Sequence, residues 1–156
     1  MKLVIDEWLW ADLSGENQTE RQTESVAFLL AAFERCDQLV TVVGSMFEQK
    51  FWNLAKRAQP GDLIRRRIVK MFRARFFYNS RKLERHTEKD LPPMPAEMEN
   101  DVDQEDRYLV RVYLSSKADL LVTTDNALQG ALHKHQKGHG VHCKLRDEFL
   151  KQYLSE

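Results

Sequence analysis

Three short runs of mainly apolar residues, separated by long amphipathic stretches, restrict the fold more than any other feature of the sequence. They cover residues 3–5, 39–43 and 120–124, and they are rich in β-branched residues. Strands that are apolar on both faces belong to parallel sheets covered by helices on both sides. The sequence therefore predicts an α/β protein: a three-layer α/β/α sandwich with a central parallel sheet of four or five strands.

Weaker patterns predict the remaining elements. Residues 82–86 and 140–144 can add strands, and the prolines of 92–95 indicate a loop. A polar loop over 11–24 leads to a helix that Ser25 caps. Further helices are expected from Ser45 to Pro60-Gly61, from Asp62 with a buried stripe of Ile64, Ile68, Met71 and Phe72, over 105–117, over 127–135 and after the last strand. No second domain is visible, so residues 1–156 are interpreted as a single domain.

Composition excludes several classes of protein. Basic and acidic residues balance at 24 each, so any attraction to nucleic acid must come from a local patch. Two distant cysteines without CxxC spacing fit a reducing compartment. The apolar run at residues 3–5 is too short for a signal peptide, and no run approaches the roughly 20 residues that span a bilayer. A soluble, cytoplasmic protein without a membrane partner is expected.

Four acidic residues are predicted to meet at one edge of the sheet. Asp6 directly follows the first strand, Glu48 lies in the first turn of the helix after the second, and Asp106 begins the helix that precedes Asp125. About 12 helical residues lead roughly 18 Å away from that edge, and five or six strand residues return about as far. Binding sites form beyond the carboxyl ends of parallel strands, so these acids are candidate site residues.

Clustered carboxylates repel one another, and a divalent cation relieves that repulsion. All-oxygen ligands favour Mg²⁺ or Mn²⁺, and such a metal can activate water against a phosphodiester. Asp103 is a candidate fifth donor. The alternative is structural: Glu48 and Asp106 would then only suit their helix dipoles, and Asp6 and Asp125 would be turn residues.

Several motifs resemble those of the PIN-domain nucleases, which include the toxins of virulence-associated toxin–antitoxin pairs. The most specific stretch is DQEDRYLVRVYLSSKADLLVTTDNAL at residues 103–128, with its two key aspartates 19 residues apart. LVIDEWL, SMFEQKFWNLAK and GVHCKLRDEFLKQYL resemble, in order, the first strand, the helix with the family glutamate and the last strand with its closing helix. The resemblance covers essentially the whole chain.

This resemblance implies that Asp6, Glu48, Asp106 and Asp125 bind Mg²⁺ or Mn²⁺ for RNA hydrolysis, with Thr123 assisting. It also implies a domain that often dimerises and an antitoxin protein as a partner. Two positions depart from the family pattern: Trp8 replaces a common asparagine, and Ala127 replaces a common second acid, which Asn126 can partly replace. For the family glutamate, Glu34 is the alternative to Glu48.

Residues 65–85 carry nine basic side chains and one acid, Glu84. A concentrated basic surface favours phosphate binding, and Phe76, Phe77 and Tyr78 could stack on unpaired bases. The alternative is a solvated face that meets an acidic antitoxin or a second subunit. The candidate RNA-binding residues are Arg65, Arg66, Arg67, Lys70, Arg73 and Arg75.

Together these patterns favour a metal-dependent endoribonuclease, either the toxin of a toxin–antitoxin pair or an RNA-processing enzyme. The alternative is a non-catalytic RNA- or protein-binding module that keeps the PIN-like fold with a degenerate metal site. Metal binding separates the two hypotheses.

Overall fold

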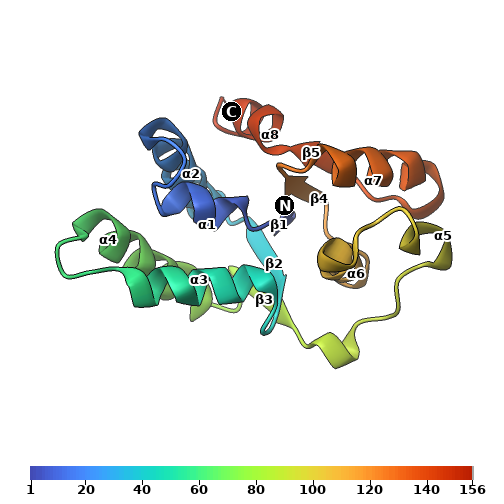
Figure 1. Ribbon diagram of the computed structural model, residues 1–156, viewed down its shortest axis with the longest axis horizontal. Coiled ribbons are helices and arrows are strands. Elements are labelled where there is room, and N and C mark those ends of the chain that lie inside the picture. Colours follow the sequence, from blue (N-terminus) through green and yellow to red (C-terminus); the bar gives the residue numbers. More distant parts are fainter. Residues whose placement is uncertain (156) are drawn as a thin grey trace.

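The computed structural model describes residues 1–155 and confirms the predicted α/β class. The described chain forms a five-stranded, entirely parallel sheet in the order β3-β2-β1-β4-β5, flanked by helices (Figure 1). Its strands are β1 (Lys2–Ile5), β2 (Gln38–Val42), β3 (Leu83–His86), β4 (Leu120–Thr123) and β5 (Cys143–Leu145). The first strand of the chain therefore lies in the middle of the sheet, between β2 and β4.

The helical elements alternate with these strands, as crossovers between parallel strands require. The α-helices are α1 (Trp8–Leu13), α2 (Thr19–Glu34), α3 (Met46–Arg57), α4 (Leu63–Phe72), α5 (Ala96–Glu99), α6 (Arg107–Ser116), α7 (Asn126–His139) and α8 (Arg146–Tyr153). A π-helical turn, η1 (Arg73–Phe77), and two 3₁₀ turns, η2 (Glu88–Asp90) and η3 (Gln104–Asp106), complete them. Within the described residues, none of these helices is long and apolar enough to cross a membrane.

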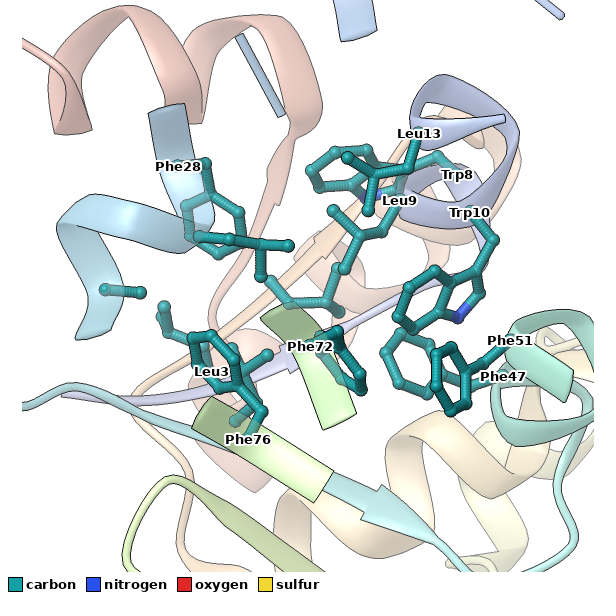
Figure 2. Close-up of a cluster of buried hydrophobic side chains, with 14 of the residues drawn as sticks. Leu3, Trp8, Leu9, Trp10, Leu13, Phe28, Phe47, Phe51, Phe72 and Phe76 are labelled. Carbon is teal, nitrogen blue, oxygen red and sulfur yellow. The ribbon is translucent and has the colours of Figure 1, made fainter. Parts of the chain in front are cut away.

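Alternate residues of the strands enter two separate cores. Leu3 and Ile5 of β1 pack against α1 to α4, η1 and α8, whereas Val4 packs against the opposite layer, built from α5, α6 and α7. The first core is rich in aromatic rings: Trp10 lies 4.7 Å from Phe72 and 5.1 Å from Phe47 between ring centroids (Figure 2). These two cores make the sheet the middle of three layers.

Trp8, one of the departures from the family pattern, belongs to the aromatic core rather than to the sheet edge. Its side chain is buried, its indole Nε1 donates to the Val122 carbonyl at 3.0 Å, and its ring lies 6.3 Å from that of Phe28. The large ring therefore has a packing role that an asparagine would not fill.

The predicted loop over residues 11–24 was wrong. The structure has α1 there and starts α2 at Thr19, so Ser25 lies inside a helix, buried, and donates to the Asp12 carboxylate at 3.0 Å. Helix α2 begins with an exposed polar turn, which hid its helical period from the sequence. The buried stripe of α4 was wrong at one position, because Ile64 is 63% exposed while Ile68, Val69 and Phe72 are buried.

Candidate active site

The site lies where β1 and β4 end side by side. Ile5 pairs with Val122, and the Asp6 amide donates to the Val122 carbonyl at 3.0 Å, which extends the β1–β4 ladder by one residue. Asp6 therefore leaves β1 at the level where β4 turns toward Asp125. The Asp6 side chain is only 8% exposed.

Thr123, the last residue of β4, links the two aspartates. Its hydroxyl Oγ1 donates to Asp6 Oδ2 at 2.6 Å and accepts the backbone N–H of Asp125 at 3.0 Å. Because Thr123 is fully buried and β-branched, its hydroxyl is held firmly. Thr123 was predicted to assist the site. Its hydroxyl contacts the side chain of one candidate acid, Asp6, and the backbone of another, Asp125.

Asp125 is the N-cap of α7. Its Oδ1 accepts the amides of Ala127 and Leu128 at 2.7 and 3.2 Å. Such a cap holds a carboxylate at the positive end of the helix dipole. Oδ2 makes no hydrogen bond within the described residues and is left for other ligands.

Asp106 lies in the electrostatic field of the other two aspartates. Burial and then the negative charges of Asp6, Asp125, Asp103 and Glu105 raise the pKa of Asp106 to about 6. Each of these contributions disfavours the ionised carboxylate. Asp6, Asp106 and Asp125, which we call the aspartate edge, therefore lie close enough to repel one another, and the exposed Asp103 contributes from the turn before α6.

Glu7 is a neighbour of this edge that the sequence reasoning missed. Burial, a side-chain hydrogen bond to Asp6 and the Asp6 charge raise its pKa to about 8, against a weaker opposing effect of Lys50. The buried hydroxyl of Tyr108 also lies near this region: burial and the charges of Glu7 and Asp6 raise the pKa of Tyr108. The available signal was adjacency, because Glu7 directly follows a strand-end aspartate.

Glu48 is in a different environment from the aspartates. Its buried carboxylate accepts Nε and Nη2 of Arg85 at 2.6 and 2.9 Å and the Gly44 amide at 3.1 Å. The alternative, Glu34, is exposed at the end of α2, where the chain enters β2, and so lies at the opposite edge of the sheet. Glu48, the fourth acid of the predicted cluster, is thus already paired with a cation, the guanidinium of Arg85.

The donor chemistry of the aspartate edge fits a hard divalent cation. Its side chains offer carboxylate and hydroxyl oxygens, and the raised pKa of Asp106 marks negative charge that the surrounding protein does not balance. Among residues 1–155, no three His, Cys, Asp or Glu side chains are arranged as a ready-made metal site. The aspartates would therefore bind a cation with some side-chain adjustment or through intervening water.

The candidate RNA-binding residues line α4 and η1, which form a basic face. Arg66, Arg67, Lys70, Arg73 and Arg75 are exposed. Arg65 is half-buried and donates from Nε to the Ser14 carbonyl at 2.6 Å, so part of its role is structural.

An open cavity of about 380 Å³ lies in the basic face, lined by Arg66, Lys70, Arg73 and Tyr78 together with small residues of α3. The Arg73 guanidinium lies over the Tyr78 ring at 5.6 Å and donates to its hydroxyl at 2.9 Å. Tyr78 is 66% exposed, so it offers a stacking surface. The expectation for Phe76 was wrong, because its ring is fully buried in the aromatic core.

Lys82, one of the nine basic residues of 65–85, is not part of the exposed basic surface. It is buried and donates to the carbonyls of Ala32 and Phe33.

No family model matches this sequence, and no curated protein matches it. Among solved structures, the chain is similar to VapBC2 from Rickettsia felis bound to a DNA fragment from their promoter. That similarity has 10% identity and a TM-score of 0.47, and it covers 93% of this chain and 98% of the other. The class assignment rests on the molecule's own architecture: a sheet of five parallel strands between two layers of helices, which defines an α/β protein.

Proposed function

We propose that this chain is a metal-dependent endoribonuclease of the PIN-like type. The observation that carries the proposal is that Thr123 links Asp6 and Asp125 where β1 and β4 end, beside Asp106, whose pKa these charges help to raise. Buried charges in proteins are usually paired with an opposite charge or bound to a metal. Carboxylates with strongly shifted pKa values occur preferentially at functional sites. The carboxyl edge of a parallel sheet is also where such sites form.

Asp6, Asp106 and Asp125 would hold Mg²⁺ or Mn²⁺, with Asp103 as a further oxygen donor. The metal would supply positive charge and lower the pKa of water for attack on a phosphodiester. Thr123 keeps one oxygen of Asp6 in place through its 2.6 Å hydrogen bond, and the α7 amides keep Asp125 oriented. The resemblance in the sequence implies products with a 5′-phosphate and a 3′-hydroxyl.

RNA would reach this edge along the basic face. The exposed Arg66, Lys70 and Arg73 can contact phosphates, and Tyr78 can stack on an unpaired base. We expect alanine at Arg65, Arg66 and Arg67 to weaken RNA binding and to reduce the slope of log K against log salt by up to about 2, at roughly 0.7 per phosphate contact. Fluorescence anisotropy of a short labelled RNA measures this. Alanine at the exposed Lys89, Lys137 and Lys151 is the matched control, and an equal effect there would remove the basic face from the proposal.

A non-catalytic binding module is the second candidate. The ion pair of Glu48 with Arg85 favours it, because a carboxylate that already has a cation is less available to metal. An antitoxin protein or a second copy of the chain would then be the partner of the basic face. Calorimetric titration with Mn²⁺ separates the candidates, since a binding module with a degenerate site takes up no metal at millimolar concentration.

Cleavage of total RNA in Mn²⁺ tests the proposed activity. We expect the wild-type protein to cleave and Asp125→Asn to lose at least about 10³-fold, since a neutral amide keeps the α7 cap but is a poor ligand. Glu20→Gln, an exposed acid in the first turn of α2, is the control and should cleave normally. Equal cleavage by wild type and Asp125→Asn, or cleavage undiminished by excess chelator, would contradict the proposal.

A further inference from the structure

The contact between Glu48 of α3 and Arg85 of β3 is the feature that the predicted four-acid cluster does not explain. It is bidentate, with Nε to Oε1 at 2.6 Å and Nη2 to Oε2 at 2.9 Å. The Gly44 amide adds a third donor to Oε2 at 3.1 Å. This hydrogen bond to Glu48 is also the largest cause that raises the pKa of Arg85.

Glu48 does not fit the role of a metal ligand in this arrangement. Both carboxylate oxygens are occupied, and the side chain is 5% exposed. A metal would have to displace a bidentate guanidinium and leave it near a new positive charge. Removing the cation from a buried carboxylate is unfavourable.

Arg85 keeps donors that face away from Glu48. A guanidinium has five N–H donors in a planar fork, and Glu48 uses two of them. Its terminal Nη1 donates to no residue among those described. The side chain is 33% exposed, and its guanidinium lies over the Phe77 ring at 4.6 Å, so both its position and its plane are fixed.

The sheet register places Arg85 at the same edge as the aspartates. Val4 pairs with Val40, Thr41 pairs with Arg85, and Ile5 is therefore level with Arg85 across the sheet. Asp6 lies one residue further along. Two strand spacings, roughly 10 Å, separate β3 from β1. Arg85 is thus a fixed, partly exposed cation at the same end of the sheet as the carboxylates.

We propose that Arg85 binds a phosphate of the RNA strand and that Glu48 positions Arg85 instead of binding metal. This inference rests on the proposed function for the identity of the ligand. Arginine suits the role because its planar fork binds carboxylate along one side and a phosphate along another. The metal would then be held by the three aspartates.

Two measurements test this assignment separately. In calorimetry with Mn²⁺, Glu48→Gln should bind metal within about twofold of wild type, whereas Asp125→Asn should bind at least about tenfold more weakly. In anisotropy with a short single-stranded RNA in excess chelator, Arg85→Ala should weaken binding by roughly 3- to 10-fold and reduce the salt slope by about 0.7. Arg81→Ala is the matched control, because Arg81 is exposed and precedes β3 at the opposite edge.

Arg85→Lys guards against loss of the fold. It keeps the charge opposite Glu48, so it should keep the wild-type melting temperature and salt slope while binding RNA more weakly than arginine does. Loss of Mn²⁺ binding in Glu48→Gln as large as in Asp125→Asn would overturn the role of Glu48. RNA binding by Arg85→Ala and Arg85→Lys equal to that of Arg81→Ala would overturn the role of Arg85. If wild type binds no Mn²⁺, the proposed nuclease function fails, and the RNA measurement alone decides Arg85.

Discussion

Asp6 and Asp12 are six residues apart and both buried, but their surroundings differ. Asp12 in α1 is fully buried, and it accepts Arg146 Nε at 2.6 Å, Asn17 Nδ2 at 2.7 Å and the Ser25 hydroxyl at 3.0 Å. Asp6 accepts a hydroxyl and a backbone amide, and the carboxyl groups of Glu7 and Asp106 lie nearby. The first carboxylate is balanced by a cation inside the protein, whereas the second has further carboxyl groups as neighbours and no ion pair among the described residues.

Arg146, which neutralises Asp12, also pairs with two further acids. Its side chain, 3% exposed, also bonds to Glu24 and Asp147, and its guanidinium lies over the Trp8 ring at 5.4 Å. Such a network joins α1, α2 and α8 and has no spare capacity for a ligand. The comparison of Asp6 with Asp12 shows that burial of a carboxylate alone does not indicate a binding site. A buried carboxylate without a counter-charge in the protein does indicate one.

The largest expected effect comes from breaking the balanced pair. Arg146→Met leaves Asp12 charged, buried and without its main partner, so we expect a loss of about 3–5 kcal/mol in the free energy of unfolding. Urea denaturation measures it. Lys134→Met is the matched control, because Lys134 is 67% exposed and its pair with Asp101 lies at the surface, where about 1 kcal/mol or less is expected. Equal losses in the two variants would show that the Asp12 network is not structural.

Supplying the missing charge should give the next largest effect. If the aspartate edge binds Mn²⁺, metal at about 100 times its Kd raises the free energy of unfolding by about 2.7 kcal/mol. Urea denaturation with and without Mn²⁺ detects this, and Asp125→Asn should lose most of the gain. A gain of equal size in Asp125→Asn would place the metal elsewhere.

A smaller effect should follow from removing one repelling charge. The pKa of Asp106 is raised to about 6, so its protonated form favours folding, and that contribution is lost as pH rises from about 4 through 6. Asp106→Asn should therefore stabilise the metal-free protein by about 1 kcal/mol at pH 7, after allowance for solvent screening, and hardly at all at pH 4. Urea denaturation at both pH values, with the exposed Asp90→Asn as control, checks this. The same difference at both pH values would contradict the repulsion.

The sheet was predictable because its strands are marked by their own residues. Each apolar run met the local conditions of a buried parallel strand, whereas the stretch that forms β3 is mostly polar and gave only a weak pattern. Asp6 and Asp125 were found because strand ends of a parallel sheet share an edge. These inferences need only the order of elements along the chain.

Features that depend on side chains from distant elements were not predictable. The pair of Glu48 with Arg85 joins α3 to β3, and the Asp12 network joins α1 to α8, so no sequence spacing announces either. Helix α1 was missed because it is short and begins close to Asp6. Its apolar residues Leu9, Trp10 and Leu13 have a helical period, but the polar residues that follow them obscured it. Charge pairing in space decides which acids are free, and the sequence contains no direct record of it.

The central place of β1 has a consequence for synthesis of the protein. A ribosome makes this strand before the rest of the sheet, but its neighbour β4, with which it forms the edge carrying Asp6 and Asp125, is made after β2 and β3. A nascent chain can pair β1 with β2 early, yet it holds only half of the acidic edge until residue 125 has emerged. A cell that makes this protein would therefore be shielded from its proposed cutting activity until β4 and residue 125 have been made.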